Sequence, residues 1–224
     1  MKYLLANWKQ NMTIKEVRDW VDVFASKLSP DSLTKNKIII APTFLHIFTL
    51  KNLLDEKGLT GKAFISSQDV SSFEKGSHTG EVGASQLSEV VQYSIIGHSE
   101  RRALGENFEM INRKIDMAVN NGINPIVCFS NKEEYSSIIS SNISKSPDSL
   151  FLFEPLFAIG TGNPATVEDL VSVHDDYANI DMIYGGSVDK SNVLNYLSCS
   201  FVKGFGVGTA SLDPDSFMDI ANTL

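Results

Sequence analysis

The 224-residue sequence has little of several features that would place a protein in a specialised class. It holds 2 cysteines, Cys128 and Cys199, which are too few for a disulfide framework and are typical of a reducing cytosol. No apolar run approaches the ~20 residues of a membrane span, and the apolar stretch near the N-terminus is too short for a signal peptide. The sequence therefore predicts a cytoplasmic protein that does not associate with membranes.

Positive charge is also scarce, with 19 Lys and Arg against 27 Asp and Glu and a formal net charge of −8. Because an acidic surface repels polyanions, this balance argues against nucleic acid as a partner. An anionic small molecule can still bind if its site carries a local positive charge. The 42% hydrophobic and 21% charged residues are a globular composition, and a chain of this length needs no disulfide or metal to fold.

Short apolar runs rich in β-forming residues recur along the whole chain, and segments with helical periodicity separate them. One such segment opens with a capping box, Thr13 and Glu16, and carries one apolar stripe, which is Val17, Trp20, Val21, Phe24 and Leu28. Ser29-Pro30 is expected to end this helix. The predicted strands are Tyr3–Asn7, Lys37–Ala41, Ala63–Ser66, Tyr93–Gly97, Ile123–Phe129, Leu150–Glu154, Asp181–Tyr184 and Phe201–Val207.

Alternation of strands and helices predicts an α/β protein with a parallel sheet covered by helices. Eight such units favour a closed (β/α)8 barrel, although periodicity alone does not separate it from an open, doubly wound sheet. No linker or change in composition divides the chain. We therefore expect a single domain over residues 1–224.

Polar side chains follow several of the predicted strands, at the end where barrels carry their active sites. Asn7 and Lys9 follow the first strand, His98 the fourth and Glu154 the sixth. Taken alone, Lys9 is most simply a surface charge and His98 a hydrogen-bonded core residue. Glu154 differs, because it lies inside the apolar run 151–157, where burial would raise its pKa and suit it to general base catalysis.

Glycine-rich segments follow the later strands. Gly160-Thr161-Gly162 matches a loose dinucleotide fingerprint, but it does not lie on a strand-to-helix turn, and no acidic residue ends the next strand. It is better interpreted as a mobile lid. Gly185-Gly186-Ser187 and Gly208-Thr209 resemble a phosphate site built by the loops after strands 7 and 8. No spacing of histidines, cysteines or carboxylates indicates a metal site.

Five segments, in the same order along the chain, make the sequence similar to the triosephosphate isomerase family. They are Asn7-Trp8-Lys9, Thr79-Gly80-Glu81-Val82, Gly97-His98-Ser99-Glu100-Arg101-Arg102, Glu154-Pro155 with Ala158-Ile159-Gly160-Thr161-Gly162, and Tyr184-Gly185-Gly186-Ser187-Val188. The resemblance implies a closed (β/α)8 TIM barrel. It implies interconversion of D-glyceraldehyde 3-phosphate and dihydroxyacetone phosphate through an enediol(ate), without a cofactor.

The resemblance also implies a role for each site residue. Glu154 would be the base, His98 the electrophile, Lys9 the cation that holds the enediolate, and Asn7 the residue that orients the oxygens. Asn7 and Lys9 would also bind substrate. Backbone N–H groups would bind its phosphate near four further residues, which are Gly160, Ser187, Gly208 and Thr209.

The family further implies a homodimer. The loop Ser71–Glu81 would reach into the other protomer, with Thr79 close to Asn11 and Glu100 of the partner subunit.

Some positions depart from the family pattern. Asn131 stands where the family has a glutamate, Thr209 replaces a glycine, and the segment between Cys128 and Glu154 is short. Two other functions therefore stay open. One is an isomerase of another small phosphosugar on the same fold, and the other is a non-catalytic phosphate-binding scaffold.

Overall fold

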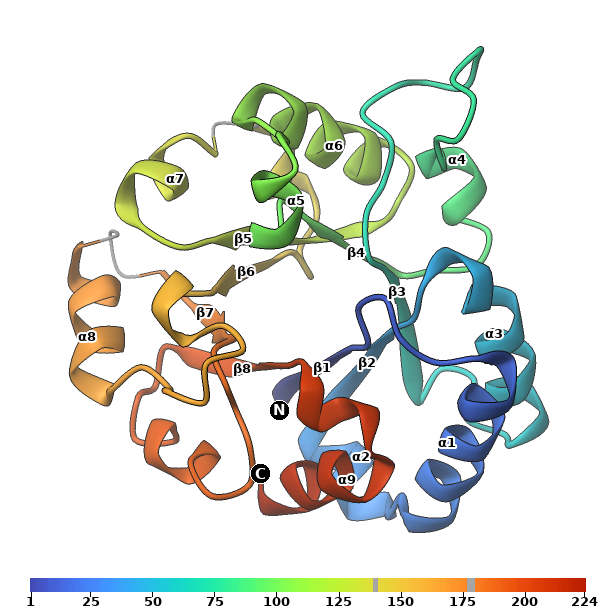
Figure 1. Cartoon of the computed structure of the whole chain (residues 1–224), viewed down its shortest axis with the longest axis vertical. Coiled ribbons are helices and arrows are strands. Elements are labelled where there is room, and N and C mark those ends of the chain that lie inside the picture. Colours follow the sequence, from blue (N-terminus) through green and yellow to red (C-terminus); the bar gives the residue numbers. More distant parts are fainter. Residues whose placement is uncertain (139–140, 177–179) are drawn as a thin grey trace.

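A computed structural model describes residues 1–138, 141–176 and 180–224. Its eight parallel strands pair in chain order, and the first also pairs with the last, so the sheet closes on itself (Figure 1). The prediction of a closed (β/α)8 barrel is confirmed. The strands are β1 (Lys2–Asn7), β2 (Asn36–Ala41), β3 (Ala63–Ser67), β4 (Tyr93–Ile96), β5 (Asn124–Phe129), β6 (Leu150–Phe153), β7 (Met182–Tyr184) and β8 (Val202–Val207).

Helices lie around the outside of the barrel (Figure 1). Within the described ranges, no helix is long and apolar enough to cross a lipid bilayer. The α-helices are α1 (Ile14–Lys27), α2 (Pro30–Lys35), α3 (Ile47–Glu56), α4 (Ala84–Leu87), α5 (Ser99–Ala103), α6 (Phe108–Asn120), α7 (Lys132–Ser136), α8 (Val167–Asp176) and α9 (Pro214–Thr223). The 3₁₀ helices are η1 (Phe44–His46), η2 (Ser141–Lys145), η3 (Leu156–Ala158), η4 (Val193–Tyr196) and η5 (Thr209–Leu212).

Helix α1 forms as its sequence predicts. Thr13 and Glu16 make the reciprocal capping box, and the apolar stripe packs into the core that lies between the helices and the sheet. The expectation that Ser29-Pro30 ends this helix is confirmed, and the structure adds a second role for the two residues. The helix ends before Ser29. Ser29 then caps α2, and Pro30 occupies the first turn of α2, where a missing backbone N–H costs nothing.

The barrel interior is a separate apolar layer. Alternate residues of the strands point inward and form a second buried cluster, which includes Leu5, Ile39, Ile95, Ile126 and Ile183. At the amino end of the strands, the Lys37 ammonium lies 5.1–5.5 Å from the ring centroids of Tyr3, Phe64 and Tyr93. This end of the barrel is therefore filled by side chains. The opposite end, where the strands finish, is the end at which a binding cavity can form.

Candidate active site

A cavity of about 460 Å³ opens at the carboxyl ends of the strands. Its wall includes every site residue expected from the sequence, namely Asn7, Lys9, His98, Glu154, Gly160, Ser187, Gly208 and Thr209. Asn7 is the last residue of β1, and the others come from segments that follow β1, β4, β6, β7 and β8. They meet because parallel strands of a barrel all end at the same edge.

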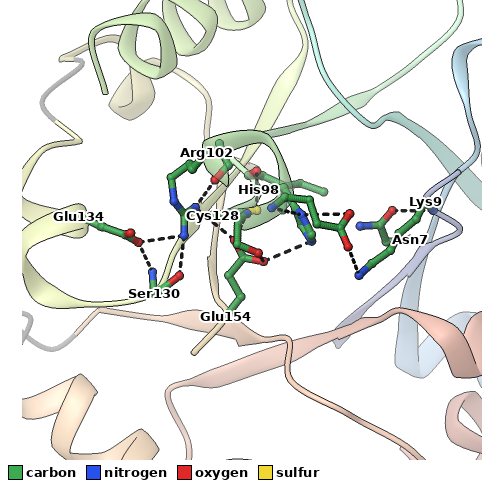
Figure 2. Close-up of polar contacts among 12 residues, drawn as sticks. Asn7, Lys9, His98, Arg102, Cys128, Ser130, Glu134 and Glu154 are labelled. Atoms are coloured by element: carbon green, nitrogen blue, oxygen red, sulfur yellow. Dashed lines mark hydrogen bonds and ion pairs between the residues drawn. The ribbon is translucent and has the colours of Figure 1, made fainter. Parts of the chain in front are cut away.

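Lys9 is held in an unusual backbone conformation at the end of β1. Its φ is 51°, a left-handed value that costs a non-glycine residue about 1–3 kcal/mol. Two hydrogen bonds fix this conformation: the Asn7 side-chain oxygen accepts from Lys9 N at 3.1 Å, and the Gln68 amide donates to Lys9 O at 2.9 Å. The ammonium pairs with Glu100 at 2.7 Å (Figure 2). Lys9 therefore places an ammonium group in the cavity wall, next to the carboxylate of Glu100.

His98 lies between the end of β4 and the start of α5. Its Nδ1 accepts a hydrogen bond from the backbone N–H of Glu100 at 3.3 Å, so this nitrogen carries no proton and the neutral ring bears its proton on Nε2. Burial lowers the pKa of His98 well below its ordinary value, and the cations of Lys9 and Arg102 act in the same direction, whereas Glu100 opposes them. The imidazole is therefore neutral near pH 7 and can donate a hydrogen bond from Nε2.

Glu154 directly follows β6 and is almost completely buried, with 2% of its surface exposed. One carboxylate oxygen accepts from Ser99 N at 2.6 Å and lies 3.2 Å from Nη1 of Arg102. The other lies 3.2 Å from His98 Nε2 and 3.3 Å from Ser99 Oγ (Figure 2). Burial raises the pKa of Glu154 to about 7, although Arg102 and Ser99 act to lower it. A carboxyl group with this pKa is suited to accept a proton near neutrality.

The lid, residues 155–165, is tied to the loop that follows β7. Ser187 Oγ donates to Ala158 O at 2.7 Å and accepts from Gly162 N at 3.2 Å. The Tyr184 hydroxyl accepts from Ala165 N at 2.7 Å. These hydrogen bonds hold the lid beside the cavity.

The glycine segments leave room at the cavity wall. A Cβ on Gly186 would lie 2.5 Å from the Tyr184 hydroxyl, so a larger residue there would displace the group that binds the lid. Gly208 faces Lys9, since its Cβ would lie 3.7 Å from Lys9 Cε. Thr209, which departs from the family pattern, opens η5 and does not adopt a positive φ, so its side chain causes no backbone strain.

Several contacts around Glu154 could not be predicted from the sequence. Ser99, Arg102 and Tyr184 lie in the family segments, but nothing in their spacing says that they bind Glu154 or the lid. Glu134 was not singled out, yet its carboxylate is 2.9 Å from Nη2 of Arg102. The glutamate lies in a short helix whose position relative to β4 is set only by the fold.

Similarity to known proteins provides a second line of evidence about the function of this site. A family model described as triosephosphate isomerase matches residues 2–224. The triosephosphate isomerase of Aquifex aeolicus is 33% identical over 248 residues, covering 98% of both chains. The enzyme of the same name from Mesomycoplasma hyorhinis is 34% identical over 236 residues, covering 97% of this chain and 96% of the relative. That from Mycoplasmopsis pulmonis is 33% identical, with 97% and 95% covered.

Proposed function

The chain belongs to the triosephosphate isomerase family, and we propose that Glu154, His98 and Lys9 carry out its proton transfers. The enzyme interconverts D-glyceraldehyde 3-phosphate and dihydroxyacetone phosphate, a step of glycolysis. The observation that carries the assignment of roles is the buried Glu154 carboxylate, which lies 3.2 Å from a neutral imidazole in the same cavity as a lysine.

In this assignment Glu154 is the base. Its carboxylate takes the proton from the carbon beside the carbonyl, and the electrons of the broken C–H bond form the carbon–carbon double bond of an enediolate. The same carboxyl group then returns the proton to the neighbouring carbon, which completes the exchange of aldehyde and ketone. A single base suffices because both carbons belong to one short substrate in one cavity.

His98 and Lys9 stabilise the charge that develops on oxygen. The Nε2–H of neutral His98 donates a hydrogen bond to the carbonyl oxygen and moves protons between the two oxygens of the enediolate. The Lys9 ammonium supplies a positive charge to the enediolate and the phosphate. Asn7 orients the oxygens.

The phosphate is assigned to the wall formed by the last loops. Backbone N–H groups near Gly160, Ser187, Gly208 and Thr209 line the cavity and suit the oxygens of a phosphate. The hydrogen bonds of Ser187 and Tyr184 to the lid support a closed state that excludes water. Exclusion of water would keep the enediolate from losing its phosphate.

A coupled assay tests the function and its substrate range. The purified enzyme is given each triose phosphate in turn and, separately, a tetrose phosphate. We expect rapid turnover of both trioses and little of the tetrose. Preferred turnover of the tetrose would assign an isomerase of another phosphosugar, and phosphate binding without turnover would assign a scaffold.

We also propose that the enzyme is a cytoplasmic homodimer. The loop Ser71–Glu81 follows β3 and extends from the barrel edge (Figure 1), where Phe73 stacks on His78 with ring centroids 4.2 Å apart. In the segment after the neighbouring strand, β2, two apolar residues are largely exposed to solvent: Leu45 has 78% of its surface exposed and Phe48 has 65%. Apolar side chains this exposed at one edge are typical of a subunit interface.

The cytoplasmic location is supported by the two cysteines. Both are free thiols, as expected in a reducing compartment.

Replacing residues 73–78 with a short glycine linker should give a monomer of low activity. In the proposed dimer the end of this loop, Thr79, lies close to Asn11 and Glu100 of the partner subunit. Glu100 is the ion-pair partner of Lys9 in its own chain, so losing the loop would displace Lys9, and a displacement of about 1 Å at such a group can lower the rate by roughly 10²-fold. Molecular mass in solution, measured beside kcat, provides the test.

A matched pair of point variants controls for the deletion. Leu45→Glu should also weaken the dimer, whereas Leu194→Glu, on the exposed face of η4 after β7, should leave it intact. A fully active monomer, or equal effects of the two leucine variants, would contradict the proposed interface.

A further inference from the structure

Arg102 joins the active site to a carboxylate outside it. Its Nη1 lies 3.2 Å from Glu154, and its Nη2 lies 2.9 Å from Glu134 (Figure 2). Nη1 also donates to Gly97 O, and Nη2 donates to Ser130 Oγ at 2.5 Å. One buried guanidinium is thus shared between the carboxylate assigned as the base and a second carboxylate.

The local sequence of α7 holds Glu134 in this position. The Asn131 side chain caps the helix by accepting from Glu134 N at 2.9 Å. Glu134 in turn accepts from Ser130 N at 2.7 Å, which directs its carboxylate back toward Arg102. Residue 131 therefore serves as a cap, and Glu134, one helical turn later, provides the carboxylate. Glu134 has 18% of its side chain exposed and Arg102 has 9%, so the pair is only weakly screened by solvent.

We propose that Glu134 is a positioning residue for Glu154 and acts through Arg102. Because Glu134 is bonded to Nη2 of Arg102, Glu154 is bonded to the guanidinium only through Nη1. The second oxygen of Glu154 then stays with His98 Nε2 and Ser99 Oγ, on the side of the cavity. Without Glu134, only the hydrogen bond to Ser130 Oγ holds Nη2 on that side. The guanidinium can then turn so that Nη2 also bonds to Glu154, and this two-point ion pair would hold the base more tightly. The inference rests on the proposed role of Glu154.

The charges around Glu154 give the direction of the effect. Arg102 and His98 face it directly, the Cys128 thiol lies beside it, and the Lys9–Glu100 ion pair lies beyond His98. The hydrogen bond to Gly97 O keeps the guanidinium near Glu154 when Glu134 is neutralised. Arg102 would then act on one carboxylate instead of two, and the pKa of Glu154 should fall.

The test is Glu134→Gln, with Glu133→Gln as its control. Glutamine retains an oxygen that can accept from Ser130 N, so the substitution removes charge and little else. Glu133 is on the same helix and is exposed, so its variant makes the same change in net charge away from Arg102. The pKa of Glu154 is followed in the free enzyme by NMR of ¹³C-labelled carboxyl groups. Its signal is assigned by its loss in Glu154→Gln.

In Glu134→Gln we expect the pKa of Glu154 to fall by roughly one unit, as a nearby charge typically produces. We expect kcat to fall about threefold to tenfold at pH 8 with KM little changed, because a weaker base transfers a proton less readily. Glu134→Asp, which keeps the charge but retracts it, should give a smaller shift in the same direction. Glu133→Gln should match the wild type in both measurements.

Equal titration of Glu154 in the two glutamine variants, or a rise in Glu134→Gln, would overturn the inference. A general loss of structure would lower activity at every pH without a downward shift of the Glu154 titration, and would also count against it. These results differ from failure of the proposed function, which would appear as an inactive wild type or as a fully active Glu154→Asp enzyme.

Discussion

Glu154→Asp should lower kcat about a hundredfold, since withdrawing a reacting group by about 1 Å can cost that much in rate. The aspartate retains the charge but loses one methylene, so its oxygens withdraw from the cavity toward β6. KM should change little, because Lys9 and the backbone groups assigned to the phosphate are untouched. The loss therefore falls on proton transfer rather than on binding.

Steady-state kinetics in both directions measures this effect. Glu168→Asp is the control, because it makes the same substitution at an exposed position on α8. A solvent-exchange experiment strengthens the test. Slower proton abstraction reduces the rate at which solvent deuterium is incorporated into substrate and product. Turnover close to that of the wild type in Glu154→Asp would remove this residue from the mechanism.

Lys9→Met should lower kcat/KM by about 10²–10³-fold, the range found when one group that stabilises a developing oxyanion is removed. Methionine has a similar length and is unbranched, so the cavity keeps its shape while losing its cation. The backbone conformation of residue 9 is fixed by bonds to its own N–H and C=O, which methionine retains. The lost partner, Glu100, is 55% exposed and can be solvated, so stability should change little.

Two measurements separate the charge of Lys9 from a structural effect. Inhibition by inorganic phosphate should weaken in Lys9→Met, because the dianion loses its nearby cation. Lys203→Met is the matched control, since Lys203 also forms an ion pair, with Asp181, but at the amino end of the strands. Similar kinetic losses in the two variants, or unchanged phosphate inhibition in Lys9→Met, would show that the charge of Lys9 is not used.

The sequence was informative about the fold because its signals are local. Each strand is a short apolar run. The start of α1 is specified by a capping box whose two residues, Thr13 and Glu16, are only three positions apart. The signal was weakest between β5 and β6, where the structure has only α7 and η2 over its described residues. Short polar helices bury little apolar surface, so they leave little periodicity to detect.

The sequence by itself located the eight strands to within one residue at each end, and the polar residues at or after those ends line the cavity. Tertiary structure decided what cannot be encoded locally. The pairing of β1 with β8 closes the barrel, and it joins segments about two hundred residues apart. The pKa of Glu154 follows from burial among several strands, because water is excluded only when the whole barrel forms. Arg102 is shared between Glu154 and Glu134 because three separate elements meet in the fold. The spacing of these residues along the chain does not predict that contact.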